Sequence, residues 1–179
     1  TLPSGLKSLD SLLHMTLTGG DIISTVPVTR WSIEESMKLG DVIGRRVSHG
    51  GFIRNVEMFD NTMFSVSPAE SKAMDPQQRL MLEVGYEALH GARLERGSLE
   101  GIITGVFAGI AANDWQDIVK NSKMARSVYA ATGASLSIAS GRLSFVLGLQ
   151  GPCASYDTAC SASLVGNHGN VRALQRLEC

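Results

Sequence analysis

Residues 156–165, YDTACSASLV, place one cysteine, Cys160, between an acidic, strand-like stretch and small residues typical of a helix start. The pattern from Cys153 to Thr158 predicts a short strand, and Ser161 to Leu177 predicts a helix. A cysteine at such a turn meets the free N–H groups of the first helical turn. These groups favour a thiolate and can hold an oxyanion, so the pattern indicates a nucleophile at a strand-to-helix turn.

The residues alone leave a second interpretation of Cys160 open, because many cysteines at such turns are inert packing residues. Thiol chemistry usually needs a nearby imidazole. His168 lies eight residues further along the predicted helix, a rise of about 12 Å, so it cannot touch the sulfur. The other three histidines have no strand-end or turn context that suggests catalysis: His14, His49 and His90.

The histidines and cysteines also lack the spacing of a zinc site, so we expect no metal. The three cysteines form an odd, sparse set that is not a disulfide framework, and this favours a reducing compartment, either the cytoplasm or an organelle interior. Cys153 is predicted to be a buried strand residue, and Cys179 is terminal.

The helix predicted after Cys160 has two uncharged faces. The apolar face consists of Leu164, Val165, Val171 and Leu174. The other face consists of small residues: Ala162, Gly166, Gly169 and Ala173. Each glycine costs about 1 kcal/mol of helix propensity. Burial must offset this cost, so we expect the helix to run through an interior.

The clearest helix start upstream is the segment from Met74 to Arg79. Asp75 is suited to cap the first turn, Pro76 to occupy the first helical position, and Gln78 to complete a capping box. The apolar residues that follow cover most of the circumference, which predicts a helix buried on several sides.

Strand and helix patterns interleave over the C-terminal part of the chain. Ile102 to Ile110 predicts a buried strand, and Asn113 to Trp115 opens a short helix. Small residues recur at steps of three or four from Gly133 to Gly148, which indicates tight core packing. We therefore predict a layered α/β fold, with residues 69–179 forming the core layers and the nucleophile turn at 157–161.

The N-terminal part is less regular. Leu6 to Leu17 predicts an amphipathic helix that ends at the glycine pair 19–20, and residues 19–68 predict loops with short helices. We expect residues 1–68 to cover a core rather than form one.

The composition suits one globular domain: 179 residues, 44% hydrophobic, with a formal net charge of −1. A net charge near zero does not indicate binding to nucleic acid or to an anionic membrane. No apolar run is long enough to span a bilayer, and the first residues do not resemble a signal peptide.

Four stretches resemble the ketosynthase (beta-ketoacyl synthase) domains of type I polyketide synthases, in the same order and over nearly the whole chain. They are FDNTMFSVSPAESKAMDPQQRLMLEVGYEAL (59–89), TGVFAGIAANDW (104–115), TGASLSIASGRLSFVLGLQGP (132–152) and DTACSASLVGNH (157–168).

The resemblance implies a thiolase-like fold, in which two βαβαβαββ halves form a five-layer sandwich, normally as a homodimer. It implies decarboxylative Claisen condensation, with Cys160 holding the growing chain as a thioester and its backbone N–H contributing to the oxyanion hole. Gly109 to Ala112 resembles part of the acyl pocket, and residues 112–133 resemble a region that meets the dimer partner. The substrates would arrive on the phosphopantetheine arm of an acyl carrier protein, with no directly bound cofactor.

The chain also departs from the family pattern. It opens inside a turn that follows the family's first strand, and it stops before the second half, which carries two decarboxylating histidines and a lysine. Ala162 stands where serine is common. We expect this chain alone to be inactive as a condensing enzyme. Two alternatives to an enzyme part are a non-catalytic structural subunit and an acyl carrier or transferase that does not condense.

Overall fold

The computed structural model describes residues 3–6, 8–38 and 40–179, and their contacts form two compact units. The N-terminal unit extends to Val56, and the C-terminal unit runs from Glu57 to Cys179. Thr1, Leu2, Lys7 and Leu39 lie outside the described residues, and Lys7 falls within the helix predicted for 6–17.

The N-terminal unit consists of short elements: η1 (Pro3–Gly5), α1 (Leu9–Leu17), β1 (Ser24–Thr25), α2 (Ile33–Met37), α3 (Asp41–Arg46) and β2 (His49–Gly50). Strands β1 and β2 pair in antiparallel fashion. The predicted helix is confirmed but starts later than Leu6. Ser8 and Ser11 form a reciprocal capping box, which fixes the first helical residue at Leu9.

The C-terminal unit contains most of the regular structure. Its elements are α4 (Pro68–Ala73), α5 (Pro76–Gly91), α6 (Arg96–Leu99), β3 (Val106–Gly109), α7 (Asp114–Lys120), η2 (Lys123–Arg126), α8 (Ala130–Ala134), α9 (Leu136–Leu147), β4 (Cys153–Tyr156), η3 (Ala159–Ser161) and α10 (Ala162–Gln175). Strands β3 and β4 are parallel, with Val106 opposite Cys153 and Gly109 opposite Tyr156.

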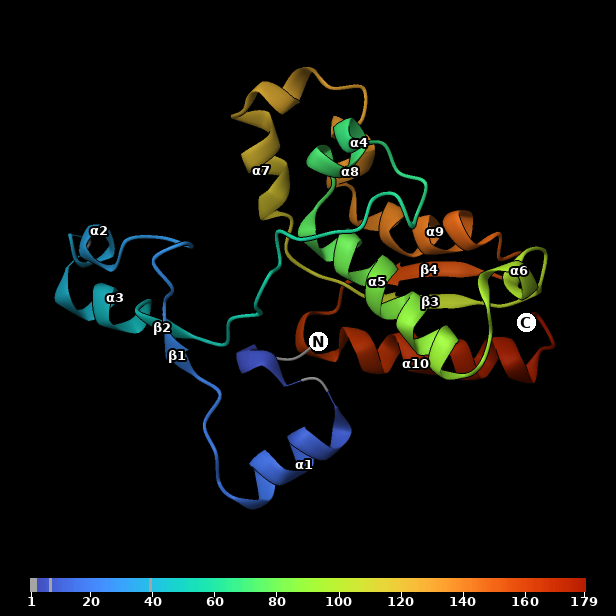
Figure 1. The fold of residues 1–179 in the computed structure, drawn as a ribbon, viewed down its shortest axis with the longest axis horizontal. Coiled ribbons are helices and arrows are strands. Elements are labelled where there is room, and N and C mark those ends of the chain that lie inside the picture. Colours follow the sequence, from blue (N-terminus) through green and yellow to red (C-terminus); the bar gives the residue numbers. More distant parts are fainter. Residues whose placement is uncertain (1–2, 7, 39) are drawn as a thin grey trace. The chain divides into compact units, whose positions relative to one another are not determined.

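The two strands lie between helical layers, as Figure 1 shows for α9 and α10. Side chains alternate between the two faces of a strand. On β4, Ser155 accordingly contacts Ser140 of α9, whereas Tyr156 lies against Gly169 of α10. Helix α5 packs against α9. The buried core consists of Phe64, Val66, Met74, Leu82, Leu99, Leu143, Leu147 and Leu149. Phe64 and Val66 therefore belong to the core, although sequence reasoning assigned residues 1–68 to a covering region.

The predicted start of α5 is confirmed. Pro76 is the first helical residue, and the Asp75 carboxylate accepts a hydrogen bond from the Gln77 N–H at 2.7 Å. The helix is less enclosed than expected, because only Gln78 and Leu82 are fully buried along α5, and Val84 is exposed. The prediction of burial on several sides was therefore wrong.

The two strands are shorter than the patterns that predicted them. Strand β3 covers only part of 102–110, although the Ile110 N–H still donates to the Tyr156 carbonyl at 3.0 Å. Strand β4 ends at Tyr156, before Thr158. Cys153 is exposed rather than buried, because β4 lies at the edge of a two-stranded sheet in the described part of the chain.

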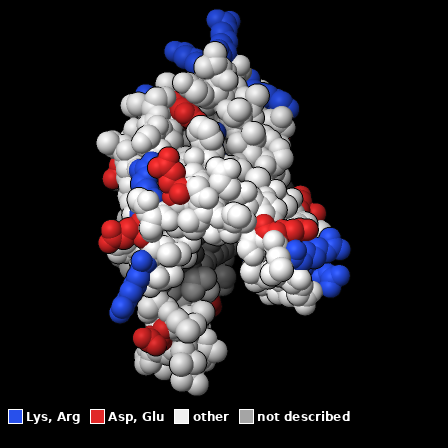
Figure 2. All heavy atoms as spheres, turned by 90° about the vertical axis from the view of Figure 1, so that its right-hand side faces the viewer, with Lys and Arg blue, Asp and Glu red and all other residues white. Residues whose placement is uncertain are grey.

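Charged side chains are dispersed over the face shown in Figure 2, where positive and negative groups lie among large uncharged areas. The described residues form no helix that is both long and apolar enough to cross a membrane.

Candidate active site

Cys160 lies in the turn between β4 and α10. Residues 159–161 form the short 3-10 helix η3, which leads directly into α10 at Ala162. The turn is held by local hydrogen bonds, since the Ser161 hydroxyl donates to the Thr158 carbonyl at 2.8 Å and Asp157 accepts from the Ala159 N–H at 3.3 Å. Cys160 is exposed. The thiol therefore lies at an accessible helix entry, as the sequence pattern predicted.

The turn requires an unusual backbone at Ala159. Its φ of +52° lies in the left-handed region, which L-residues other than Asn, Asp and Gly rarely adopt. The residue directly before Cys160 is therefore held in an unfavourable conformation by its surroundings, and such positions cluster at functional sites.

Gly109 ends β3 directly against the first turn of α10. A Cβ built on Gly109 would lie 2.6 Å from the Ser163 nitrogen and 2.8 Å from the Ala162 carbonyl carbon. Only glycine allows this approach, so the end of β3 and the start of the cysteine-bearing helix are in direct contact.

Ala112 lies in the loop that follows β3. Its φ is +65°, and its carbonyl accepts a hydrogen bond from the Gln77 side-chain amide at 3.1 Å. Because β3 and β4 are parallel, this loop and the Cys160 turn leave the same edge of the sheet. Ligands of open α/β sheets bind at this edge, outside the carboxyl ends of the strands.

Helix α10 presents its small face to the strands. Ala162, Gly166 and Ala173 are buried, and a Cβ on Gly169 would lie 2.8 Å from the Tyr156 hydroxyl oxygen. The larger apolar face points away, with Leu164 72% exposed in this chain. Close packing on β3 and β4 offsets the propensity cost of the glycines. Only this face of α10 is buried in the described structure, so the expectation that the helix runs through an interior was wrong for this chain.

All four histidines are exposed: His14, His49, His90 and His168. Within the C-terminal unit, no described hydrogen bond joins His90 or His168 to Cys160, and the other two histidines belong to the N-terminal unit. Over the ranges that the structure describes, no group of three or more His, Cys, Asp or Glu residues gathers in a way that could hold a metal ion.

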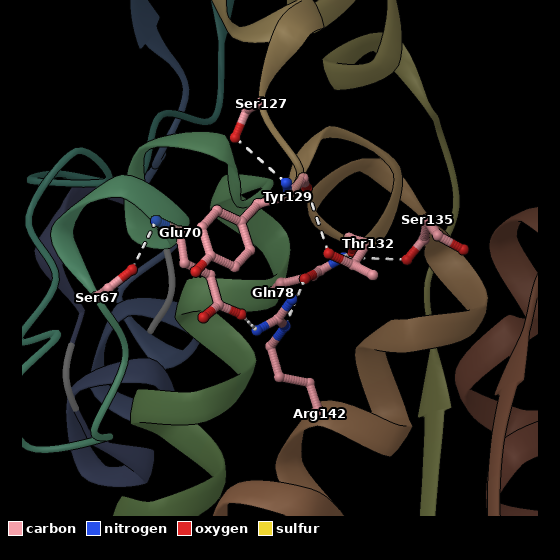
Figure 3. Close-up of polar contacts among 8 residues, drawn as sticks. All are labelled: Ser67, Glu70, Gln78, Ser127, Tyr129, Thr132, Ser135 and Arg142. Atoms are coloured by element: carbon pink, nitrogen blue, oxygen red, sulfur yellow. Dashed lines mark hydrogen bonds and ion pairs between the residues drawn. The ribbon is translucent and has the colours of Figure 1, made fainter.

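Sequence reasoning missed a polar network between helices of the C-terminal unit (Figure 3). The Arg142 Nε donates to the Gln78 side-chain oxygen at 2.9 Å, and the Arg142 guanidinium also pairs with Glu70. The Gln78 amide donates to the carbonyls of Thr132 and Ser135. Gln78 is therefore not a capping-box partner, and it ties α5 to the α8–α9 junction. The sequence signal that could have revealed this network is Arg142 itself, which stands as a lone charge in a long uncharged stretch, residues 127–156.

Asp75 is also part of the buried polar framework. It is 3% exposed, and its N–H donates to the Gly133 carbonyl at 2.8 Å. Burial raises the pKa of the Asp75 carboxyl, hydrogen bonds from Gln77 oppose this increase, and the nearby Asp114 adds to it.

A hollow of about 370 Å³ runs along β3 between α5 and α10, and its lining includes Gly105, Phe107 and Asn167. Cys160, Gly109 and Ala112 are not part of this lining. On α10, the lining begins at Ser163, in the first turn of the helix.

A parallel α/β layer with a cysteine at the strand-to-helix turn defines a protein of the thiolase-like class. The family model for the beta-ketoacyl synthase N-terminal domain matches residues 1–179, and the chain belongs to this family.

The curated relatives are type I polyketide synthases. The chain is 42% identical over 180 residues to the phenolphthiocerol synthesis polyketide synthase type I Pks15/1 of Mycobacterium bovis. It is 41% identical over 181 residues to the pikromycin polyketide synthase component PikAII of Streptomyces venezuelae. These matches cover 99% of the chain but only 8% and 5% of the two relatives.

Solved ketosynthases share the fold. The ketosynthase from module 6 of the bacillaene synthase of Bacillus subtilis 168 matches with a TM-score of 0.79 and 30% identity. The oxazolomycin ketosynthase domain OzmH KS7 of Streptomyces albus JA3453 matches with a TM-score of 0.84 and 28% identity. Each match covers 99% of this chain and 28% or 31% of the solved chain, so the sequence corresponds to the N-terminal part of a ketosynthase domain.

Proposed function

We propose that Cys160 is the nucleophile of a polyketide-type ketosynthase and carries the growing acyl chain as a thioester. The observation that supports this most strongly is its position, exposed in the turn that joins the carboxyl end of β4 to the first turn of α10. Backbone N–H groups at a helix entry are suited to hold the oxyanion that forms when a thioester carbonyl is attacked.

In the loading step, the Cys160 sulfur attacks the carbonyl of an acyl group held on the phosphopantetheine arm of an acyl carrier protein. A C–S bond to Cys160 forms, and the C–S bond to the arm breaks. The arm leaves as a thiolate and takes up the proton that Cys160 released. The Cys160 N–H would stabilise the tetrahedral oxyanion on the way.

In the condensation step, a malonyl-type unit on the carrier protein loses CO₂. The resulting carbanion attacks the Cys160 thioester, forms a C–C bond and releases the Cys160 thiolate. We assign the groups that assist decarboxylation to the remainder of the ketosynthase domain, since this chain covers only 28% and 31% of the two solved chains.

The substrate-facing residues that we propose are Gly109 and Ala112, because they lie at the sheet edge where the Cys160 turn begins. The partners are an acyl carrier protein, the rest of the ketosynthase domain and a second copy of it. We expect a reducing compartment, either the cytoplasm or an organelle interior, because the three cysteines are an odd, sparse set and are all free.

The test is acylation of the polypeptide that contains this chain, using an acyl thioester and peptide mass analysis. We expect the acyl group on the Cys160 peptide and its loss in Cys160→Ala. Cys153→Ser and Cys179→Ser are matched controls that should still acylate, because neither cysteine lies at a helix entry. Equal acylation of the three cysteines would contradict the proposal.

A second candidate function is a non-catalytic structural role. It is favoured by one observation: within the C-terminal unit, no described hydrogen bond joins Cys160 to His90 or His168. The same experiment separates the candidates, since a polypeptide that does not acylate at Cys160 would support the structural role. Acylation without C–C bond formation would instead support acyl transfer alone.

A further inference from the structure

Residues 110–113 form the loop that joins β3 to α7, at the same sheet edge as the Cys160 turn. We infer that the Gln77 side chain is a positioning residue, which fixes this loop so that Ala112 faces the acyl chain on Cys160. The inference rests on the proposed function, and it adds a residue from a different helix to the site.

The backbone of the loop needs external support. Ala112 has a φ of +65°, and an alanine in the left-handed region is disfavoured by about 1–2 kcal/mol relative to the right-handed form. Its carbonyl is held by the Gln77 Nε2, which donates at 3.1 Å from a residue 35 positions earlier in the chain. This long-range hydrogen bond offsets the cost of the local conformation.

Gln77 is itself held in place. Its Nε2 also donates to the Asp75 Oδ2 at 3.4 Å, and its backbone N–H donates to the Asp75 Oδ1 at 2.7 Å. The amide group therefore uses both of its hydrogens, one on Asp75 and one on Ala112. Asp75 is buried and bonded to Gly133, so the amide is oriented by a fixed anchor rather than by a mobile surface group.

Helix capping does not account for the Gln77 side chain. The cap of α5 needs only the Asp75 carboxylate and the backbone N–H of Gln77, which any residue other than proline supplies. The contact between the side-chain amide and the Ala112 carbonyl is an additional interaction, and it connects the start of α5 with the loop at the proposed substrate site.

The experiment uses the polypeptide that contains this chain, as wild type, Gln77→Ala and Gln77→Glu. The glutamate variant keeps the length of the side chain and replaces the amide donor by a carboxylate, which also faces the Asp75 carboxylate, so its effect should be at least as large as that of Gln77→Ala. Gln150→Glu is the matched control, since Gln150 is exposed and no described hydrogen bond uses its side chain. Three quantities are measured: hydrogen exchange of amides 110–113, acyl loading of Cys160 with short and long acyl thioesters, and alkylation of Cys160 by iodoacetamide.

We expect loop exchange to become about threefold to tenfold faster in both Gln77 variants, which corresponds to the loss of one hydrogen bond. KM for long acyl thioesters should rise by a similar factor, while kcat and the rate of alkylation change less than about twofold. Gln150→Glu should behave as wild type.

Four outcomes would overturn the inference. Unchanged loop exchange would show that Gln77 does not hold the loop. An equal decrease in loading and alkylation would show a general structural defect rather than positioning. Wild-type polypeptide that does not load any acyl group would overturn the proposed function and the positioning role together. Normal wild-type loading with unchanged Gln77 variants would overturn the positioning role alone.

Discussion

The Nε of Arg142 donates a hydrogen bond to the side-chain oxygen of Gln78 at 2.9 Å, linking α9 to α5 inside the C-terminal unit. The same guanidinium pairs with Glu70 of α4, so three helices meet at one buried cation. A buried cation of this kind is costly unless every partner is present. This single side chain therefore links α4, α5 and α9 through polar contacts beside the apolar core.

Arg142→Met should destabilise the ketosynthase domain that contains this chain. It leaves the Glu70 carboxylate and the Gln78 oxygen without their partner, and we expect a decrease of about 2–4 kcal/mol in the free energy of unfolding. Lys120→Ala is the control, because its ion pair with Asp117 is exposed and should contribute less than about 0.5 kcal/mol. Denaturant unfolding measures both, and similar losses in the two variants would contradict the importance of the buried network.

Gly109→Ala should disturb the site more than the remainder of the fold. The new Cβ would lie 2.6 Å from the Ser163 nitrogen, so the end of β3 must move away from α10. We expect a loss of about 1–3 kcal/mol and slower acylation of Cys160. Gly97→Ala is the control, since a Cβ there meets nothing within 4 Å, and the change should be neutral or slightly stabilising. Unaltered acylation in Gly109→Ala would show that this contact does not shape the site.

Two substitutions at Ala159 test the strained turn. Ala159→Gly removes the left-handed penalty and should be tolerated, with stability within about 1 kcal/mol of wild type. Ala159→Val should cost about 2 kcal/mol more than glycine and reduce acylation of Cys160, because a β-branched residue is disfavoured at positive φ. Ala125→Val, at an exposed position without positive φ, is the control. Thermal unfolding measures stability, and mass analysis of the Cys160 peptide measures acylation. Equal behaviour of the glycine and valine variants would contradict the assignment of strain.

Asp75 should contribute a characteristic pH dependence. Its pKa is raised by burial from the ordinary value of 3.8, so the folded state holds the proton more tightly than the unfolded state. The stabilisation that the protonated Asp75 contributes to the folded state is fully present below pH 3.8 and is lost as the pH rises through the folded pKa. The free energy of unfolding of Asp75→Asn, relative to that of wild type, should therefore increase as the pH rises from 3.8 through the folded pKa. At higher pH the difference should stay constant.

The control for the Asp75 experiment is Asp117→Asn, which removes one negative charge from an exposed position. A pH titration of urea unfolding compares the three proteins. A difference between Asp75→Asn and wild type that shrinks with rising pH would show that hydrogen bonds from Gln77, rather than burial, control the Asp75 carboxyl.

Local signals predicted much of the fold. The Asp75 cap, the Pro76 start of α5 and the turn at Cys160 each depend on neighbouring residues, so a short window of sequence contains the necessary information. The resemblance in four long motifs predicted the thiolase-like class, and the solved ketosynthases confirm it.

Long-range partners could not be predicted in the same way. Gln78 fits a capping box locally, but its partner Arg142 lies 64 residues away and provides a better-satisfied buried arrangement. The exposure of Cys153 depends on strand order, which no local pattern encodes. The roles of Cys160, Gly109 and Ala112 stay predictions, because position alone does not measure reactivity.

The parallel pairing of β3 with β4 also has a consequence for the order in which the chain folds. The residues from α7 to α9 lie between the two strands in the sequence, so they must all be synthesised before Val106 can pair with Cys153. Such distant pairing is slow to form, since loop entropy is lost before contacts compensate for it. We therefore expect the Cys160 turn, which follows β4 directly, to reach its final geometry late in folding.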